Sequence, residues 1–167
     1  WANRGAGEMA VWIPRTIEKS KPMPLPTIST QAKVTCSTPN RSLQSVHDGV
    51  WPVHSNDREV PFFSLWPKNN SEEWIEYEFD KAETVSSATL YWFDDGPWGG
   101  CRIPLSWKIS YKDPSGGWMD VHALHEFIPK KNALNTVSFE PVTTRNIRLV
   151  FQLPVEESCG IYEFEVR

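Results

Sequence analysis

Two adjacent carboxylates, Asp94 and Asp95, open a segment that reads DDGPWGGCRIP. Paired acids are the residue types that catalyse glycoside hydrolysis. Successive side chains of an extended chain point to opposite sides, so two neighbouring acids do not flank one glycosidic bond well. We therefore expect no catalysis here. One carboxylate would cap the turn, and the other would accept hydrogen bonds from Arg102 or from a sugar hydroxyl.

The same segment presents a tryptophan and an arginine. Pro97 restricts the backbone before Trp98, while Gly99 and Gly100 free it afterwards, which would hold the indole out from the surface. A flat exposed ring can stack on the C–H face of a sugar while polar neighbours bind its hydroxyls. Arg102 offers a planar fork of donors for vicinal hydroxyls or a uronate carboxylate. An ion pair that fixes the loop is an equal alternative for it.

A second group of candidates lies in segment 48–67, DGVWPVHSNDREVPFFSLWP. The segment is rich in aromatic residues and proline and shows no strand period, so we expect it to cross one end of a β-sandwich. Its candidates for sugar binding are Trp51 and Trp66 as stacking rings, with His54 and Asp57 as hydrogen-bonding groups. For Trp66, burial in the core is the preferred alternative.

Composition argues against several classes of partner. The chain has 167 residues and a net charge of −4, with its lysines and arginines scattered, so we expect no nucleic acid partner. No apolar run approaches the roughly 20 residues of a membrane helix, and acidic, histidine-bearing loops do not favour a membrane surface. Nine tryptophans exceed what one small core needs, and we interpret the surplus as ring surface for carbohydrate.

No residues show the spacing of a transition-metal site or of a nucleophilic active site. Cys36, Cys101 and Cys159 match no metal-ligand pattern. A bridge between Cys36 and Cys159 is one alternative, and free buried thiols are the commoner one. His122 and His125 stand three residues apart but have no obvious third ligand.

Short segments of alternating apolar and polar residues run through the chain, separated by Gly, Pro, Asn and Asp. In WIEYEF, for example, Ile75, Tyr77 and Phe79 share one face. The pattern predicts an all-β fold, an antiparallel jelly-roll β-sandwich of about eight strands with one buried face each. The one helical turn that we expect is at 42–48. The predicted strands are 32–36, 74–79, 85–93, 106–112, 118–122, 135–140, 146–153 and 160–166.

The N-terminal part differs in composition from the rest. Residues 1–15 hold one strand-like run, EMAVWI, and residues 16–27 carry three prolines at alternate positions. Such a proline-rich stretch is an extended spacer. We therefore predict three parts: the terminal strand of a preceding β-sandwich domain in 1–15, a linker in 16–27, and the jelly-roll domain in 28–167.

The order and spacing of several motifs resemble the discoidin or coagulation-factor type C domain, a galactose-binding-like jelly roll. These motifs are SLQSVHDG, EWIEYEFDKAETVSSATLYW, RIPLSWKISYKD, TTRNIRLVFQ and GIYEFEV, and the resemblance covers residues 32–167. The resemblance implies that ligands bind on the loops at one end of the jelly roll.

The resemblance also implies one metal, a structural calcium ion held between Asp48 of the D-G pair and Glu163 of YEFEV. Calcium takes roughly six to eight oxygen ligands. Val50 and Val53 stand where the family pattern has oxygen-bearing side chains. We therefore expect weak or absent calcium dependence, with an Asp48 that organises a turn as the preferred alternative. We expect no other cofactor.

A closer resemblance is to the C-terminal part of bacterial six-hairpin glycosidases related to β-L-arabinofuranosidases. The motifs that carry it are GEMAVWIPR, HSNDREVPFFSLWP, EWIEYEFDK, YWFDDGPWGGCRIPLSW and NTVSFEPVTT. In that family an (α/α) barrel upstream of these motifs holds the catalytic glutamate and a cysteine-rich metal site. The resemblance implies that this chain is not itself an enzyme. It also implies a secreted bacterial parent in the periplasm or outside the cell, whose preceding domains are partners of this chain.

These observations predict a non-catalytic accessory module of a glycoside hydrolase that binds plant-type oligosaccharide or polysaccharide. The alternative is a structural domain that packs on the catalytic barrel and binds no sugar. A protein- or lipid-binding adhesion domain ranks below both. The candidate carbohydrate-binding residues are Trp98, Asp94, Asp95, Arg102, His54, Trp66, Trp51 and Asp57.

Overall fold

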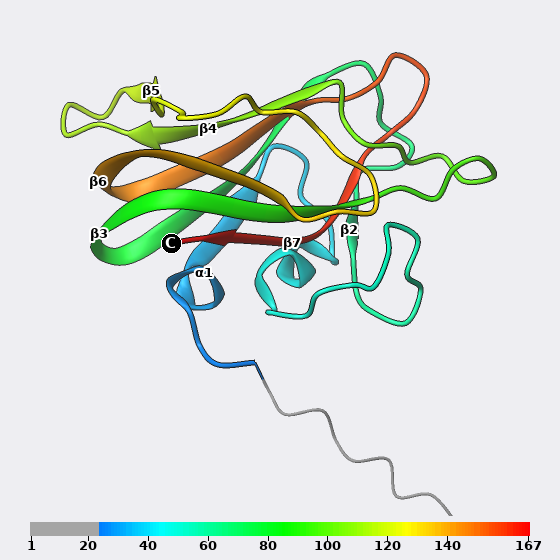
Figure 1. Ribbon diagram of the computed structural model, residues 1–167, viewed down its shortest axis with the longest axis horizontal. Coiled ribbons are helices and arrows are strands. Elements are labelled where there is room, and N and C mark those ends of the chain that lie inside the picture. Colours follow the sequence, from blue (N-terminus) through cyan, green and yellow to red (C-terminus); the bar gives the residue numbers. More distant parts are fainter. Residues whose placement is uncertain (1–23) are drawn as a thin grey trace, which may run out of the picture.

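Within the described residues, seven strands form one antiparallel sheet that bends back on itself as a β-sandwich (Figure 1). The computed structural model describes residues 24–167, so the strand predicted at 1–15 and most of the linker predicted at 16–27 lie outside the described residues. The elements are α1 (Ile28–Gln31), β1 (Lys33–Cys36), the 3₁₀ helix η1 (Leu43–His47), β2 (Phe63–Ser64), β3 (Glu72–Phe93), β4 (Ser106–Lys112), β5 (Trp118–Asp120), β6 (Asn135–Gln152) and β7 (Gly160–Val166).

Strands β3 and β6 are long enough to take part in both halves of the sandwich. The pairing register of β3 shifts between Glu78 and Glu83, where the strand bends. Before the bend, β3 pairs with β1 and with residues 146–152 of β6; after it, β3 pairs with β7 and with residues 135–144 of β6. In addition, β2 pairs with β7, β4 with β6 and β5 with β4. The strand order is therefore β2-β7-β3-β6-β4-β5, with β1 beside β3.

The predicted all-β jelly-roll class is confirmed, but the strands divide the chain differently. The segments predicted at 74–79 and 85–93 are the two arms of β3, and those at 135–140 and 146–153 are the two arms of β6. The residues between the arms bend the chain without ending its ladder, as β-bulges do. Strand β2 has two residues, so its sequence is too short to show an alternation of apolar and polar side chains.

Alternation along the strands fills the core as the sequence predicts. On β3, Ile75, Tyr77 and Phe79 are buried, while their neighbours Trp74 and Glu76 lie partly exposed on the outer face. The same parity buries the inward residues of β4 and β6. This burial is the main favourable contribution to folding, and it fixes which side chains remain on the outer face.

The helical elements are short. The turn predicted at 42–48 is η1, whereas α1 is not predicted by the sequence. Thr27 and Thr30 cap α1 reciprocally: each backbone N–H donates to the other's hydroxyl, at 2.8 Å from Thr27 and 3.2 Å from Thr30. No helix in residues 24–167 is long and apolar enough to cross a membrane.

The three cysteines are free thiols in the folded protein. Cys36, Cys101 and Cys159 are all buried, and burial raises the pKa of each thiol. The alternative of a bridge between Cys36 and Cys159 is therefore not realised. Thiols with a raised pKa carry little reactive thiolate, so these residues serve as small packing groups.

Candidate functional site

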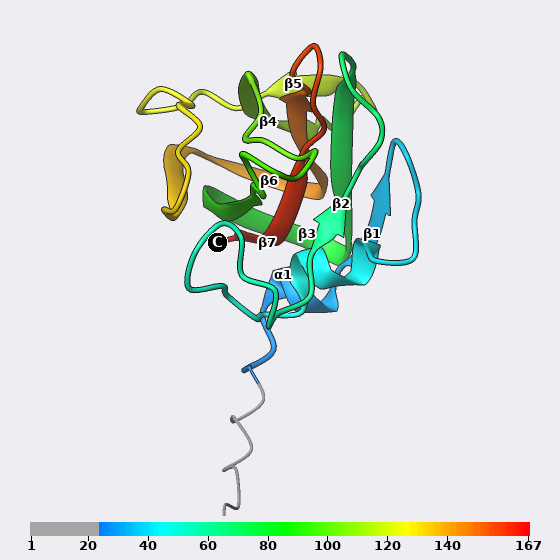
Figure 2. The same cartoon turned by 90° about the vertical axis from the view of Figure 1, so that its right-hand side faces the viewer.

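The two segments that carry the sequence candidates meet at one end of the sandwich. The backbone N–H of Asp94 donates to the Ser55 carbonyl at 2.8 Å, which ties loop 94–104 to segment 48–62. The Tyr162 hydroxyl, from β7, also donates to the Ser55 carbonyl, at 3.1 Å. The loops form one cluster on the right of Figure 1, and Figure 2 views the molecule from that side.

A pocket of about 240 Å³ opens between the two loops. Two of its aromatic residues, Phe62 and Phe93, stack with centroids 3.9 Å apart and an interplanar angle of 7°. The guanidinium carbon of Arg58 lies 5.0 Å from the Phe93 ring centroid, and its Nη2 donates to Asp95 Oδ2 at 3.1 Å. The cation is thus oriented by a ring face and a carboxylate. The lining residues are Arg58, Phe62, Ser64, Trp66, Phe93, Asp95, Gly100 and Cys101.

Trp66 provides the exposed ring of this pocket, and the prediction that it lies in the core is wrong. Its side chain is 66% exposed, whereas the preceding Leu65 is buried. Strand β2 ends at Ser64, and Trp66 lies in a turn that the Lys68 N–H closes by donating to the Leu65 carbonyl at 2.9 Å. The indole lies against Gly100: a Cβ on Gly100 would stand 2.6 Å from Cδ1 and Nε1 of the ring.

Trp98 stands at the tip of loop 94–104, as its local sequence predicts. The residue is 96% exposed. An indole that remains in water gives up burial worth about 2 kcal/mol, so the arrangement favours contact with a ligand or partner.

Asp94 is enclosed at the base of the loop. Its Oδ1 accepts from the Gly96 N–H at 3.0 Å and from Lys131 Nζ at 2.6 Å, and its Oδ2 accepts from the Ile103 N–H at 3.2 Å. The carboxylate therefore joins the two ends of the loop. Because the residue is buried and its oxygens are occupied, we assign Asp94 to the loop structure instead of the ligand.

Arg102 holds the loop in the same way. Its Nη1 donates to the carbonyls of Gly99 and Cys101, at 2.8 and 2.7 Å, and its Nη2 donates to the Pro97 carbonyl at 3.2 Å. The nearest oxygen of Asp95 is 3.9 Å away. Arg102 therefore fixes the loop, as the alternative to sugar binding expects. It does so mainly through hydrogen bonds to backbone carbonyls, and the expected ion pair is the longer contact.

Asp95 is the one of the two adjacent carboxylates that lines the pocket. Its Oδ1 accepts from the Cys101 N–H at 2.8 Å, and its Oδ2 faces Arg58. A Cβ on Gly99 would stand 1.9 Å from Asp95 Cγ, so this approach requires a glycine. The pocket therefore presents a carboxylate whose orientation is set by the loop backbone.

The three remaining sugar candidates do not line the pocket. Asp57 is buried and accepts from the backbone N–H groups of Val53 and Glu59, at 2.9 and 3.0 Å, so it shapes its own turn. His54 is exposed, and its Nδ1 accepts from a backbone N–H two residues on. Trp51 packs against a small second cluster of buried aromatic residues.

Arg58 is the main pocket residue that is not among the candidates predicted from the sequence. Arg58 lies in the aromatic-rich segment 48–67, which has no strand period. A planar guanidinium donor in such a segment could have indicated a sugar-binding residue. The choice between Arg58 and Arg102 depends on the ring of Phe93, the last residue of β3, and on Asp95, which lies 37 residues from Arg58 in the sequence. Sequence alone does not supply that pairing.

The two calcium-ligand candidates are brought together by the fold. The carboxyl groups of Asp48 and Glu163 hydrogen-bond to each other, and Glu163 also accepts from the Gly49 N–H at 2.9 Å. Burial, followed by the negative charge of Asp48, raises the pKa of Glu163 to about 9. Glu163 is therefore protonated at neutral pH and donates to Asp48.

This pair fits a calcium ion poorly. Two backbone N–H groups, of Gly49 and Val50, point at the carboxyl oxygens, whereas calcium needs a shell of oxygens around it. Val50 and Val53 add no side-chain oxygen. Within residues 24–167, no group of three or more His, Cys, Asp or Glu side chains gathers as a metal site would require.

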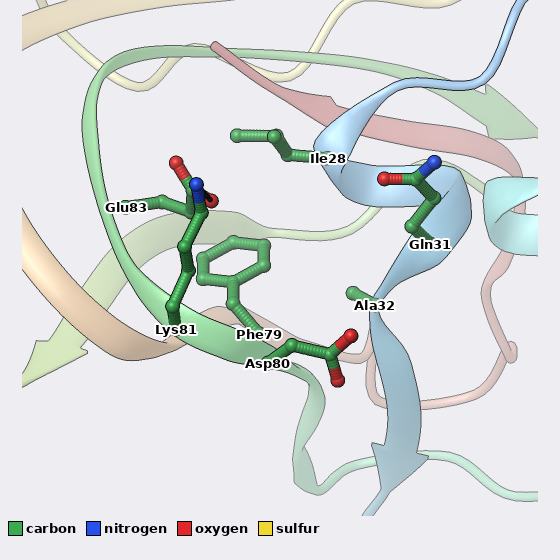
Figure 3. Close-up of a pocket in the computed structure, with 7 residues that line it drawn as sticks. All are labelled: Ile28, Gln31, Ala32, Phe79, Asp80, Lys81 and Glu83. Atoms are coloured by element: carbon green, nitrogen blue, oxygen red, sulfur yellow. Dashed lines mark ion pairs between the residues drawn. The ribbon is translucent and has the colours of Figure 1, made fainter.

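A different cavity, of about 300 Å³, lies between α1 and the bend of β3 (Figure 3). These two elements lie on the left of Figure 1, away from the loop cluster. Ile28 and Phe79 give it an apolar side, and Phe79 is almost fully buried. Lys81 and Glu83 pair with each other at 3.7 Å. Without an exposed ring, this cavity lacks the stacking surface that the loop pocket has.

Comparison with known proteins identifies one matching family, the F5/8 type C domain, over residues 33–164. Several solved structures share the fold, among them the following three. A chain of the β-galactosidase BgaA from Streptococcus pneumoniae is 19% identical, with a TM-score of 0.67, and the match covers 86% of this chain and 96% of that one. The family 32 carbohydrate-binding module of NanJ from C. perfringens, in complex with galactose, is 18% identical, with a TM-score of 0.63 and coverage of 83% and 96%. Chitosan-binding module 1 of a chitosanase/glucanase from Paenibacillus sp. IK-5 is 16% identical, with a TM-score of 0.61 and coverage of 84% and 97%.

Proposed function

The chain belongs to the F5/8 type C domain family, and from that premise we propose that it is a non-catalytic carbohydrate-binding module. Its sugar site is the pocket between the loops, with Arg58, Trp66 and Asp95 as the binding groups. The single observation that carries this proposal is the exposed indole of Trp66 beside an oriented guanidinium and carboxylate in one pocket.

Each of these groups has a distinct task. The Trp66 ring stacks on the C–H face of a sugar, and Arg58 donates to adjacent hydroxyls from a fixed plane. Asp95 accepts from a further hydroxyl while its other oxygen remains bound to the loop backbone. At about 240 Å³ the pocket is smaller than the roughly 300–1,000 Å³ typical of drug-sized ligands, so it suits one sugar ring.

Trp98 extends this site beyond the pocket. It lies two residues from Gly100, which contacts the Trp66 ring, and its own ring is almost fully exposed. We assign Trp98 to a second sugar residue of an oligosaccharide, outside the ring that the pocket holds. Asp94 and Arg102 support both tryptophans indirectly, because they fix the loop that carries Trp98 and Gly100.

The protein context is part of the same proposal. The parent is a bacterial glycoside hydrolase related to β-L-arabinofuranosidases, located in the periplasm or outside the cell. Residues 1–15 end a preceding domain, 16–27 link it to this module, and 28–167 form the module. Support comes from the sequence motifs and from structural neighbours in a β-galactosidase and in a chitosanase/glucanase.

The test is direct binding of the 167-residue chain to sugars. Isothermal titration uses galactose, which the NanJ module binds, and its relative N-acetylgalactosamine, together with L-arabinose for the proposed parent and chitotriose as a fragment of chitosan. Trp66→Ala and Arg58→Ala should each weaken the best of these ligands by about tenfold or more. Leu124→Ala, at an exposed site on another loop, is the matched control and should leave the affinity unchanged. Absence of binding to every sugar, including larger plant polysaccharides, would refute the proposal.

A structural role without sugar is the second candidate, and one observation favours it. Leu124, Ile128 and Leu134 are each more than half exposed on the loop between β5 and β6. Apolar groups so placed suit packing against a neighbouring domain. This role predicts that replacing Leu124, Ile128 and Leu134 by serine weakens association with the catalytic domain, and that none of the sugars tested above binds.

A further inference from the structure

The outer face of the sheet, away from the loop cluster, carries an ordered set of aromatic and polar side chains. In one row across the strands, Trp74 on β3 faces Val150 on β6. In the next row, Glu76 of β3 faces Arg148 of β6, which in turn faces Ser110 of β4. These residues alternate with the buried core residues of the same strands, so they all lie on the outer side.

Arg148 is held rigidly at the centre of this face. Its guanidinium carbon lies 4.0 Å from the Trp74 ring centroid and 3.9 Å from the Trp118 ring centroid. Its Nε donates to Glu76 Oε2 at 2.8 Å, and Glu76 accepts from Asn146 with its other oxygen. Two rings and a carboxylate therefore fix the plane of the guanidinium.

The terminal nitrogens of Arg148 remain available. Among residues 24–167, no acceptor receives a hydrogen bond from Nη1 or Nη2, although the side chain is only 24% exposed. A half-buried donor edge that is fixed in orientation but not satisfied within the protein is suited to an external acceptor. Vicinal hydroxyl groups match the spacing of such a fork.

These donors line a groove of about 390 Å³, larger than the loop pocket. Val150 gives the groove an apolar surface, while Trp118 and Met119 of the edge strand β5 border it. Lys108 and Asp120 pair at 3.0 Å, and Arg148 is paired with Glu76. Glu72, which also lines the groove, adds one further negative charge. Since the other charges are paired, the groove offers hydrogen bonds and ring surface without a strong net field.

From this arrangement we propose a second carbohydrate-binding surface, the groove on the outer face of β4, β5 and β6, which binds a neutral polysaccharide chain. Arg148 donates to hydroxyl groups, and the tryptophan and Val150 surfaces take up the apolar faces of sugar rings. An acidic glycan is disfavoured, because its carboxylates would approach Glu72 and Asp120. None of the groove's lining residues lines the loop pocket, so the two sites are separate.

The test uses the 167-residue chain in native gels that contain soluble galactan, arabinoxylan, mixed-linkage β-glucan or polygalacturonate. The double variant Arg58→Ala/Trp66→Ala, which removes the loop pocket, should still be retarded by at least one neutral polysaccharide. Adding Trp118→Ala or Arg148→Lys should then weaken the remaining affinity by about tenfold. Arg148→Lys keeps the charge that pairs with Glu76 and loses the planar fork, so it separates recognition from folding.

A second measurement follows the unaltered chain, and a third tests whether substitutions in the groove leave the loop pocket intact. In ¹⁵N spectra of the unaltered chain, the indole signals of Trp74 and Trp118 should shift when oligosaccharides of the retarding polysaccharide are added. Trp118→Ala and Arg148→Lys in the otherwise unaltered chain should leave monosaccharide binding at the loop pocket unchanged. The proposal is overturned if the pocket variant is retarded by no neutral polysaccharide, if only polygalacturonate retards it, or if the two indole signals do not move.

Discussion

The Trp66 indole lies directly against Gly100, so that a Cβ on this glycine would come within 2.6 Å of ring atoms Cδ1 and Nε1. The two residues belong to different loops, and their contact sets where the exposed ring stands above the pocket. A side chain at position 100 would have to move the ring, because the three heavy atoms nearest to such a Cβ all belong to Trp66.

Gly100→Ala should therefore weaken sugar binding without unfolding the protein. The displaced ring is exposed and free to move, so we expect a loss of less than about 1 kcal/mol in the free energy of unfolding. Sugar affinity should fall by about fivefold or more, measured by titration calorimetry. Gly117→Ala is the matched control, since a Cβ there meets Asp113 only at 3.5 Å or beyond. Unchanged affinity in Gly100→Ala would remove Trp66 from the binding site.

Trp98→Ala should weaken oligosaccharide binding more than monosaccharide binding, because Trp98 lies outside the pocket. The residue is 96% exposed, so the free energy of unfolding should change by less than about 1 kcal/mol. Titrations with a monosaccharide and its longer oligomers, together with urea unfolding, measure both quantities. A large loss of stability with unaltered binding would make Trp98 a structural residue.

Asp94→Ala should destabilise the protein, in contrast to the substitutions at the pocket. The change leaves the Gly96 and Ile103 N–H groups and Lys131 without their acceptor, at a cost of about 2–3 kcal/mol. Urea unfolding monitored by tryptophan fluorescence measures the loss. Lys131→Ala should cost less, because its ammonium group is partly exposed to water. Equal stability of Asp94→Ala and the unaltered chain would contradict the loop-fixing role.

Stability should decrease as pH rises from about 4.5 towards 9, because of Glu163. Its pKa is raised from 4.5 to about 9 in the folded protein, so the folded state holds a proton that the unfolded state has released. The stability linked to this proton is complete below pH 4.5 and is lost as pH approaches 9. Urea unfolding at pH 5, 7 and 8.5 should show the decline.

Glu163→Gln is the matched variant for this pH effect. Glutamine donates to Asp48 and accepts from the Gly49 N–H as the protonated glutamate does, but it does not titrate. The decline between pH 5 and 8.5 should therefore flatten in the variant. Asp48 and Glu165 act on Glu163 with negative charge, while Arg167, which lines the same pocket, is paired with Glu165 at 3.0 Å. An equal slope in both proteins would assign the pH effect to another group.

Calcium should leave the melting temperature of the 167-residue chain unchanged. A bound ion would stabilise the folded state by mass action, but the Asp48–Glu163 pair offers few oxygens and faces two N–H donors. Thermal unfolding with millimolar calcium, with magnesium as the control, and with a chelator measures the effect. A rise of several degrees that the chelator reverses would establish a calcium site here.

Local sequence was sufficient for the features that depend on near neighbours in the chain. Period-2 alternation identified Ile75, Tyr77 and Phe79 as the buried face of the first β3 arm, because inward and outward side chains must alternate along an extended backbone. The exposure of Trp98 followed from Pro97 before it and two glycines after it. The all-β jelly-roll class followed from the number of such strands and the lack of long helices.

Tertiary structure alone decided which polar and aromatic groups serve a site. Asp94 and Asp95 are identical in type and adjacent, yet one is buried against Lys131 and the other faces Arg58. Arg148 gains its place between Trp74 and Trp118 from three different strands. Such pairs are far apart in the sequence, and their contact depends on strand register and on the bends of β3 and β6. A register is selected by the packing of the whole core, so no local pattern contains it.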